Sequence, residues 1–537
     1  MQPPFLSLPS LDAPNPYPTP SRPVLARNVV ATSQPLAAEA GLWMLRCGGN
    51  AVDAAIAAAI TLTVVEPTGC GLGSDAFAMV WDGARFHGLN ASGRSPAAWN
   101  ADRFADRKVM PERGWESVVV PGAVSGWAAL SERFGRLPFA DLCQPAIDYA
   151  RRGFAVTPTV AHLWARGAAL LKDQPGFAET FLPDGEAPEA GEVFRCEAMA
   201  RTIETIANSR GEDFYRGDLA RRVADFAAQH GAALTARDLA DHSNDWAVPL
   251  SVDFYDSSLQ ELPPNGQGLA ALIAAGILSE LGVDALPPDS AGSLHLQIEA
   301  MKLAFADLHQ YVADPDHMAR PAEAFLDRDY LRTRARLVDH RKAGLPVYGV
   351  PRRGGTVYLT AADANGMMVS FIQSNYMGFG SGVVVPGTGI SLQNRGCGFR
   401  AEPGHANSVG PCKRPFHTII PGFASRQGHP VMSYGVMGAA MQAQGHVQMA
   451  LRVLLHGQDP QTASDAPRWR VTGGLNVALE SRVAPTVAAE LASLGHHVTV
   501  EPEVAHQAFG GAQAIVRMNG VYAGGSDHRK DGKAVGF

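Results

Sequence analysis

The chain has 537 residues, of which 46% are apolar and 18% charged, and its 45 basic and 52 acidic side chains give a net charge of −7. This apolar fraction is typical of a globular protein and excludes disorder over most of the chain. The acidic excess, without a basic tract, argues against a nucleic-acid-binding protein. The sequence contains no run of about 18 or more consecutive apolar residues, which a transmembrane helix would need, so we expect no membrane partner.

The N-terminal segment, residues 1–24, contains eight prolines and lacks the basic-then-apolar pattern of a signal peptide. We expect it to form an extended arm over the surface. The six cysteines are too sparse for a disulfide framework and show no CxxC spacing. They are typical of free thiols in a reducing compartment, so we expect a cytoplasmic protein.

From residue 25 to about residue 345 the pattern is mainly helical. Ser33 ahead of Pro35 predicts an N-cap, and Gly48-Gly49 predicts the end of that helix. A second helix, residues 52–64, is apolar nearly all round, which predicts a buried position. Further helices are predicted over residues 122–134, 139–152, 196–208, 217–230, 268–281 and 294–311.

After Gly354 the pattern changes to short apolar runs separated by tight turns. Asn365-Gly366 predicts a hairpin that joins residues 357–361 to 367–373. Asn519-Gly520 predicts a second hairpin, between residues 512–517 and 521–523. A strand over residues 431–434 and helices over residues 444–456 and 485–494 complete this half. Helices combined with antiparallel hairpins predict an α/β sandwich with buried sheets.

Residues 345–355, between the halves, are rich in proline, glycine and arginine. This composition is typical of an accessible, irregular segment. It is consistent with an ordinary linker or with a processing site. The second interpretation gains weight because Thr356 stands at the head of the first hairpin.

Most catalytic motifs are absent. There is no Walker A sequence and no GxSxG elbow, and Gly69–Gly73 reads GxGxG, which favours close backbone approach between layers over nucleotide binding. The 17 histidines show no HExxH or other metal-ligand spacing, so we expect no metal and no cofactor. His496-His497 follows a helix-ending glycine and is expected to face solvent.

Five groups of motifs carry a resemblance to a known family. They cover residues 31–41, 48–55 and 65–67; 120–126 and 134–138; 295–307; 355–356, 380–382 and 389–390; and 413–415, 435–438 and 531–532. In this combination the chain resembles the γ-glutamyltransferase (γ-glutamyltranspeptidase) family of N-terminal-nucleophile hydrolases from about Val29 onward.

The resemblance implies a four-layer αββα fold and self-cleavage between Gly355 and Thr356. The products would be a large subunit, residues 25–355, and a small subunit, residues 356–537, which remain together as a heterodimer in one composite domain. Thr356 would supply the Oγ1 nucleophile and, after cleavage, an α-amine base with a reference pKa of about 8. The resemblance further assigns Ser374 as the hydroxyl that orients the nucleophile. It assigns Gly438 and Ala439 as the two backbone donors of the oxyanion hole, where the family usually has Gly-Gly.

The substrate positions depart from the pattern of enzymes that act on γ-glutamyl donors. Gly398 stands where those enzymes place a carboxylate for the donor's α-ammonium, and Arg395 replaces an amide residue. The other positions implied to contact the small-molecule amide substrate are Arg94, Tyr376, Asn394, His417 and Thr418. A site that lost an acid and gained a base favours an acyl group that ends in a carboxylate and lacks an amine.

Three functions remain open on the sequence alone. The first is a self-processing amide hydrolase that acts on γ-glutamyl-like or carboxylate-bearing acyl amides. The second is a true γ-glutamyltransferase or glutathione hydrolase with a rearranged pocket. The third is a catalytically idle relative that serves as a binding protein, which the intact Gly355-Thr356 pair disfavours.

Overall fold

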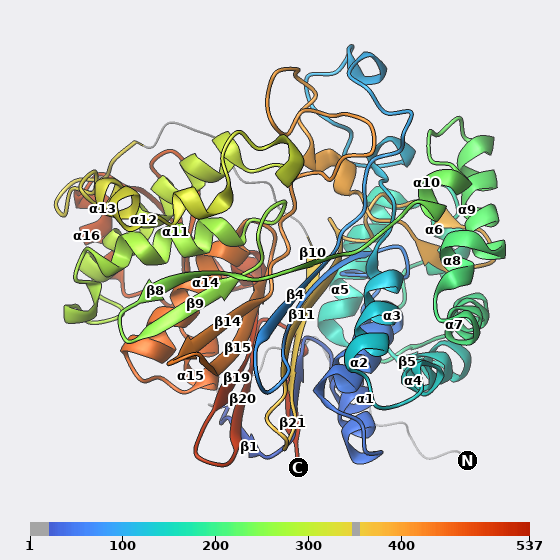
Figure 1. Cartoon of the computed structure of the whole chain (residues 1–537), viewed down its shortest axis with the longest axis horizontal. Coiled ribbons are helices and arrows are strands. Elements are labelled where there is room, and N and C mark those ends of the chain that lie inside the picture. The colour runs from blue at the N-terminus through green and yellow to red at the C-terminus, as the bar shows by residue number, and fades with distance from the viewer. Residues whose placement is uncertain (1–20, 346–354) are drawn as a thin grey trace, which may run out of the picture.

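The computed structural model describes residues 21–345 and 355–537. Two seven-stranded sheets are stacked on each other, and helices cover the outer face of each (Figure 1). This is the αββα order that the family resemblance implied, and it confirms the predicted α/β sandwich with buried sheets. The first 20 residues of the proline-rich arm and residues 346–354 of the inter-half segment lie outside the described residues.

The first sheet is antiparallel throughout. Its strand order is β8 (Leu250–Phe254), β9 (Ser257–Glu261), β14 (Gly422–Arg426), β15 (His429–Met437), β19 (Gly511–Arg517), β20 (Tyr522–Ser526) and β1 (Val24–Ala26). The β19–β20 hairpin confirms the one predicted around Asn519-Gly520.

The second sheet is also antiparallel and carries the other predicted hairpin, β10–β11, at its centre. Its order is β7 (Asp245–Ala247), β4 (Phe86–Ala91), β3 (Asp75–Trp81), β11 (Met368–Tyr376), β10 (Gly355–Ala362), β2 (Val29–Thr32) and β21 (Lys533–Gly536). Both sheets therefore interleave strands from before and after the Gly355–Thr356 bond.

The first half of the chain contributes more strands than its helical pattern suggested. All seven residues of β3 are buried, so the strand lacks the alternation of apolar and polar residues that marks a half-exposed strand. Strands β4 and β9 are also almost entirely buried. Because both faces of these strands are covered, the period-2 signal was lost.

The two helical layers differ in which part of the chain supplies them (Figure 1). The second sheet is covered by α1 (Pro35–Arg46), α2 (Ala51–Val65), α3 (Ala123–Phe134) and α4 (Phe139–Arg152). The first sheet is covered by α11 (Gly268–Ser279), α12 (Ala291–Tyr311), α14 (Met441–Ala450) and α15 (Pro460–Asp465). Every residue of α2 is buried, as its all-round apolar sequence predicted.

The start of α1 corrects one local prediction. Its N-cap is Gln34, whose side chain accepts hydrogen bonds from the backbone N–H groups of Leu36 and Ala37. The hydroxyl of Ser33 instead donates to the buried carboxylate of Glu66 at 2.5 Å. Ser33 thus forms a hydrogen bond to a residue distant in sequence instead of capping the helix.

The remaining elements lie around this four-layer core. The helices are α5 (Pro158–Leu171), α6 (Phe177–Phe181), α7 (Glu197–Ser209), α8 (Glu212–Arg216), α9 (Asp218–Gln229), α10 (Ala236–Ala240), α13 (Arg328–Ala335) and α16 (Pro485–Ser493). The short strands are β5 (Phe154–Ala155), β6 (Val193–Phe194), β12 (Val384–Val385), β13 (Ile390–Ser391), β16 (Trp469–Gly473), β17 (Asn476–Glu480) and β18 (His497–Glu501). None of the helices in the described ranges is long and apolar enough to cross a membrane.

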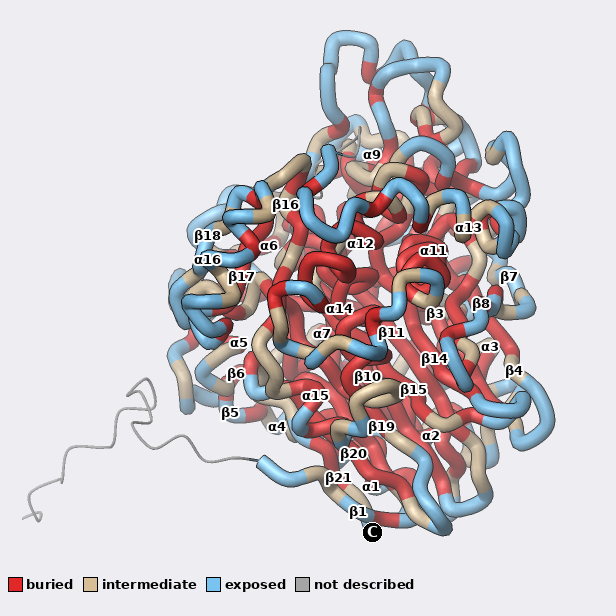
Figure 2. Tube along the Cα trace, turned by 90° about the vertical axis from the view of Figure 1, so that its left-hand side faces the viewer, coloured by how far each residue is buried: buried red, intermediate tan, exposed pale blue. Residues whose placement is uncertain are grey.

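Large side chains from both sheets fill the space between them. Phe77, Tyr358 and Ile372 from the second sheet pack with Phe423 and Ile515 from the first, and all are buried. Figure 2 shows the strands as an almost continuous buried block beneath exposed loops. The ends of β10 and β11 are therefore fixed by rigid neighbours, and that is where the candidate site lies.

Candidate active site

Thr356 lies at the start of β10, buried, with its Oγ1 3.3 Å from Oγ of Ser374 on the neighbouring strand β11. The register changes here: Gly355 pairs with Tyr376, whereas Val357 pairs with Gln373. Such a bulge redirects side chains next to many active sites. Ser374 Oγ also accepts the backbone N–H of Tyr376 at 2.7 Å, which orients the hydroxyl that faces Thr356.

The glycine-rich loop Gly69–Gly73 packs directly against this strand end. A Cβ on Gly69 would lie 2.7 Å from Val357 Cγ1, and one on Gly71 would lie 2.0 Å from Ser391 Oγ. The backbone N–H of Asn375 donates to the carbonyl of Gly69 at 3.1 Å. These contacts confirm close backbone approach as the reason for the glycines.

Gly438 and Ala439 form the turn that connects β15 to α14. Their φ angles are 126° and 54°, so both lie in the region that favours glycine. Ala439 therefore carries its Cβ in a left-handed conformation, beside Tyr376 and Met377. The side-chain amide of Gln267 donates to the Ala439 carbonyl at 2.7 Å and also to the carbonyl of Thr418, which holds the turn in place.

A cavity of about 320 Å³ opens beside this turn. Gln267 and Ala440 line it on the side of the turn, and Tyr376, Gly398 and Thr418 line it on the side of the predicted substrate positions. Tyr376 takes a φ of 82°, which is strained for a bulky residue. The structure thus brings Tyr376 and Thr418 together at one cavity, as a shared substrate role requires.

Arg395 lies immediately next to these two residues but is itself 1% exposed and does not line the cavity. Its Nη1 donates to Thr418 Oγ1 at 2.8 Å, and its guanidinium lies 4.4 Å from the centre of the Tyr376 ring. Among the residues that the structure describes, neither its Nε nor its Nη2 has a hydrogen-bond acceptor. Burial lowers the pKa of Arg395 to about 10, so the side chain remains charged at neutral pH.

His417 and Asn394 serve as internal supports rather than cavity walls. His417 is fully buried, and its Nε2 lies 3.1 Å from Oδ2 of Asp75, a carboxylate that the sequence did not single out. Burial raises the pKa of Asp75 to about 7 although Arg395 lies nearby. Asn394 accepts from the N–H of Met377 at 3.2 Å and donates to the carbonyl of Glu112 at 2.7 Å.

The remaining sequence candidate, Arg94, lies apart from the cavity lining. It is partly exposed and forms an ion pair with Asp245 at 3.6 Å. Arg113, which the sequence did not single out, donates from Nη1 to the carbonyl of Gly378 at 3.0 Å, in the loop that follows Tyr376. Gln442 was also missed, and its Nε2 lies 3.4 Å from Thr356 Oγ1.

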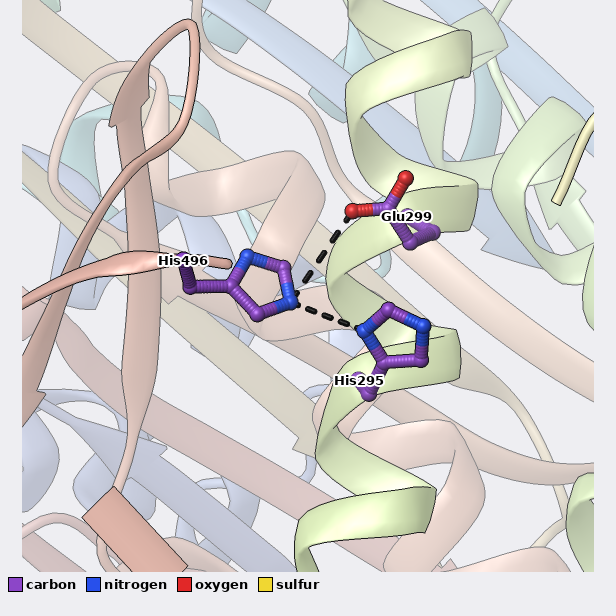
Figure 3. Close-up of side chains that lie close together, drawn as sticks. All are labelled: His295, Glu299 and His496. Carbon is purple, nitrogen blue, oxygen red and sulfur yellow. Dashed lines mark hydrogen bonds and ion pairs between the residues drawn. The ribbon is translucent and has the colours of Figure 1, made fainter. Parts of the chain in front are cut away.

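Three residues, His295, Glu299 and His496, come close enough together to resemble a metal site (Figure 3). His295 and Glu299 are one turn apart on α12, and His496 comes from the segment before β18. His496 is 3% exposed, so the expectation that it faces solvent was wrong; His497 is exposed. The sequence contains a His-x-x-x-Glu spacing on a helix, which provides two possible ligands. Only the fold brings the third, His496, next to them.

Hydrogen bonds already occupy these ligand atoms. His496 Nε2 lies 2.8 Å from His295 Nδ1, and His295 Nε2 donates to the Asp339 carbonyl at 2.8 Å. Lys302 places its ammonium 2.7 Å from Glu299 and 3.4 Å from His496 Nδ1. Because a lysine cation already neutralises the carboxylate, the arrangement fits a buried hydrogen-bond network better than a cation site.

Comparisons with known proteins identify the family of the chain. The family model described as gamma-glutamyltranspeptidase matches residues 37–537. An oxamate amidohydrolase proenzyme of Klebsiella pneumoniae is 38% identical over 94% of this chain and 97% of its own length. A glutathione hydrolase-like proenzyme of Bacillus subtilis, YwrD, is 36% identical over 95% of this chain and 98% of its own length.

Among solved structures, a cephalosporin acylase from Bacillus halodurans is 45% identical, covers 98% of both chains and superimposes with a TM-score of 0.94. The family match, the interleaved αββα layers and the threonine at the head of the central hairpin agree with one another. The chain therefore belongs to the γ-glutamyltranspeptidase family of self-processing N-terminal-nucleophile hydrolases.

Proposed function

We propose that this protein hydrolyses amides whose acyl group ends in a carboxylate and carries no α-amino group. The observation that carries this proposal is the buried, charged Arg395, which has two donor nitrogens without an acceptor among the described residues and lies against Tyr376 and Thr418. A guanidinium in such a position is suited to a carboxylate ligand. From the cavity the acyl carboxylate would meet the Thr418 hydroxyl, which lines it, with the charge of Arg395 directly behind.

The charges around the cavity support an anionic acyl group. Lys108 and Arg400 line it, and Glu402 is the acidic residue among its described lining residues. Burial lowers the pKa of His309 to about 4, so this lining histidine is neutral at neutral pH. Together with the nearby Arg395, the described charged side chains at the cavity are mostly basic, which favours a carboxylate over an ammonium group.

The close packing around Gly398 also argues against an ammonium-binding site. A Cβ on Gly398 would lie 2.5 Å from the carbonyl oxygen of Phe416. An aspartate or glutamate at this position would therefore require a backbone shift. The acid that γ-glutamyl-specific enzymes use is thus both absent and sterically disfavoured here.

The reaction would follow the chemistry that the resemblance implies. The freed α-amine of Thr356 takes the proton of Oγ1, and Oγ1 forms a bond to the acyl carbon while the carbonyl electrons move to its oxygen, which the N–H groups of Gly438 and Ala439 would stabilise. Return of those electrons expels the amine, which takes the proton from the α-ammonium. Water then releases the acid by the same steps.

The decisive test compares glutaryl-p-nitroanilide with γ-glutamyl-p-nitroanilide, which differ by the α-amino group. We expect a higher kcat/KM for the glutaryl compound. Arg395→Met should lower that kcat/KM about tenfold or more, since a hydrogen bond to a charged group contributes about 1.5–3 kcal/mol. Arg400→Met, an exposed cavity arginine, is the matched control and should have a smaller effect.

The opposite preference would favour the second candidate, a γ-glutamyltransferase or glutathione hydrolase. If Arg395→Met and Arg400→Met behave alike, the assignment of Arg395 to the acyl carboxylate is wrong. A catalytically idle binding protein is not supported by relatives that are named as proenzymes of hydrolases. We further propose a cytoplasmic location, which the six free thiols support.

A further inference from the structure

Gln442 lies in the first turn of α14, three residues after Ala439, and its side chain is fully buried. Its Oε1 accepts the backbone N–H of Ile420 at 3.0 Å. This bond fixes the orientation of the side-chain amide, because only its oxygen can accept a hydrogen bond. The Nε2 group is consequently directed at Thr356 Oγ1, at 3.4 Å.

Within the described part of the chain, the side chains of Gln442 and Ser374 meet the hydroxyl of Thr356. Ser374 Oγ can donate to Oγ1 or accept from it, whereas Nε2 of Gln442 can only donate to it. A hydroxyl that accepts from a fixed donor has one of its two lone pairs occupied. The same donor would stabilise negative charge on that oxygen.

We propose that Gln442 is a further catalytic residue, whose Nε2–H donates to Thr356 Oγ1 and stabilises the charge on this oxygen. That charge develops when Oγ1 loses its proton to the base, and again when the C–Oγ1 bond of the acyl-enzyme breaks and the electron pair returns to Oγ1. This inference rests on Thr356 as the nucleophile of the proposed function. It does not depend on which acyl group the enzyme prefers.

Gln442→Glu separates catalysis from structural support. A glutamate retains an oxygen for the Ile420 N–H but has no N–H to offer to Oγ1. The chain provides a matched control in Gln444, which lies on the same turn, is also buried and accepts the backbone N–H of Val471 at 2.6 Å. Its Nε2 donates to the Ala440 carbonyl at 3.3 Å instead of to the nucleophile.

The experiment measures self-cleavage of the full chain on denaturing gels over time, and kcat and KM of the cleaved protein with whichever nitroanilide the wild type hydrolyses. We expect Gln442→Glu to slow self-cleavage and to lower kcat about tenfold or more with little change in KM, as for loss of a donor to a reacting oxygen. Gln444→Glu should stay within about threefold of the wild type, because it keeps an oxygen for the Val471 N–H and loses only the bond to the Ala440 carbonyl, which does not involve the nucleophile.

The pH profile provides a readout that a structural role would not change. A buried carboxyl tends to take up a proton, and the carboxyl that Gln442→Glu introduces would regain a donor once it is protonated. The ratio of kcat for Gln442→Glu to that of the wild type should therefore rise as the pH falls from about 8 to about 6. Equal behaviour of the two glutamate variants at every pH would overturn the proposal.

A second variant covers the case in which Gln442→Glu does not fold, as judged by gel filtration. Gln442→Met removes both hydrogen bonds without introducing charge, and normal self-cleavage of this variant would also overturn the proposal. Because self-cleavage needs no added substrate, its result stands even if the acyl preference of the proposed function is wrong.

Discussion

The Oγ atoms of Thr356 and Ser374 face each other at 3.3 Å across a bulge in the β10–β11 hairpin. The residues are 18 positions apart in sequence, and both lie on strands at the centre of a fully covered sheet. Their separation is therefore fixed by the strand register rather than by loop flexibility. The two hydroxyls are held in this way before any substrate binds, as their proposed roles of nucleophile and orienting group require.

Self-cleavage provides the first prediction. The purified wild-type chain should resolve into two fragments without added protease, and the smaller one should begin at Thr356. Thr356→Ala should remain intact and inactive because it lacks Oγ1, whereas Thr356→Ser should still process. N-terminal sequencing of the small fragment checks the position, and cleavage of the alanine variant at that bond would refute the nucleophile assignment.

The left-handed conformation of Ala439 predicts a marked asymmetry between two substitutions. Ala439→Gly should change the free energy of unfolding by no more than about 1 kcal/mol and retain activity, because glycine adopts a φ of 54° at little cost. Ala439→Val should sharply lower kcat, since a β-branched side chain disfavours this conformation. Steady-state kinetics with urea unfolding tests both, and an active valine variant would show that the turn is not required in this form.

Asp75 predicts a dependence of stability on pH. Burial raises its pKa to about 7, so between pH 4 and 7, roughly, the folded chain holds a proton that the unfolded chain has released. The stabilisation from Asp75 is therefore present at low pH and lost as the pH rises toward 7. The asparagine in Asp75→Asn does not titrate. The difference in the free energy of unfolding, variant minus wild type, should therefore increase from about pH 5 to about pH 8.

Urea unfolding of both proteins in a Thr356→Ala background, which keeps the chain in one piece, measures this difference. Parallel pH curves for the two proteins would show that Asp75 does not retain its proton in the folded state.

The buried pair Lys302–Glu299 predicts a large loss of stability on removal of one partner. Lys302→Met should lower the free energy of unfolding by about 3–5 kcal/mol, because it leaves the carboxylate buried without its cation. The double variant Lys302→Met/Glu299→Met should recover much of the loss. Arg221→Met, which breaks an exposed pair with Asp218, is the control and should cost less than about 1 kcal/mol.

The network around His496 also leads us to expect that a chelator has no effect. Self-cleavage and hydrolysis should be the same with and without EDTA, and added Zn²⁺ should not raise the melting temperature. A rise in melting temperature that His496→Ala abolishes would instead show that His295, Glu299 and His496 bind a metal ion.

The sequence alone determined the features that depend on local pattern. Asn-Gly turns between apolar runs predicted both hairpins, and the apolar sequence of α2 predicted that this helix is buried. Five groups of motifs along the chain indicated the family, and with it the fold. Ser33 shows the limit of such reasoning: its capping signal was sound locally, but the carboxylate of Glu66 gave it a different partner.

Only the tertiary structure decided which distant residues meet. The strands of the first half were hidden because burial on both faces removes the alternation of polar and apolar residues. Asp75 beneath His417, Gln442 at the nucleophile and His496 beside α12 all arise from contacts between segments far apart in sequence. Local sequence encodes conformation and burial, whereas the pairing of buried polar groups depends on how the layers pack, so these contacts became visible only in the folded chain.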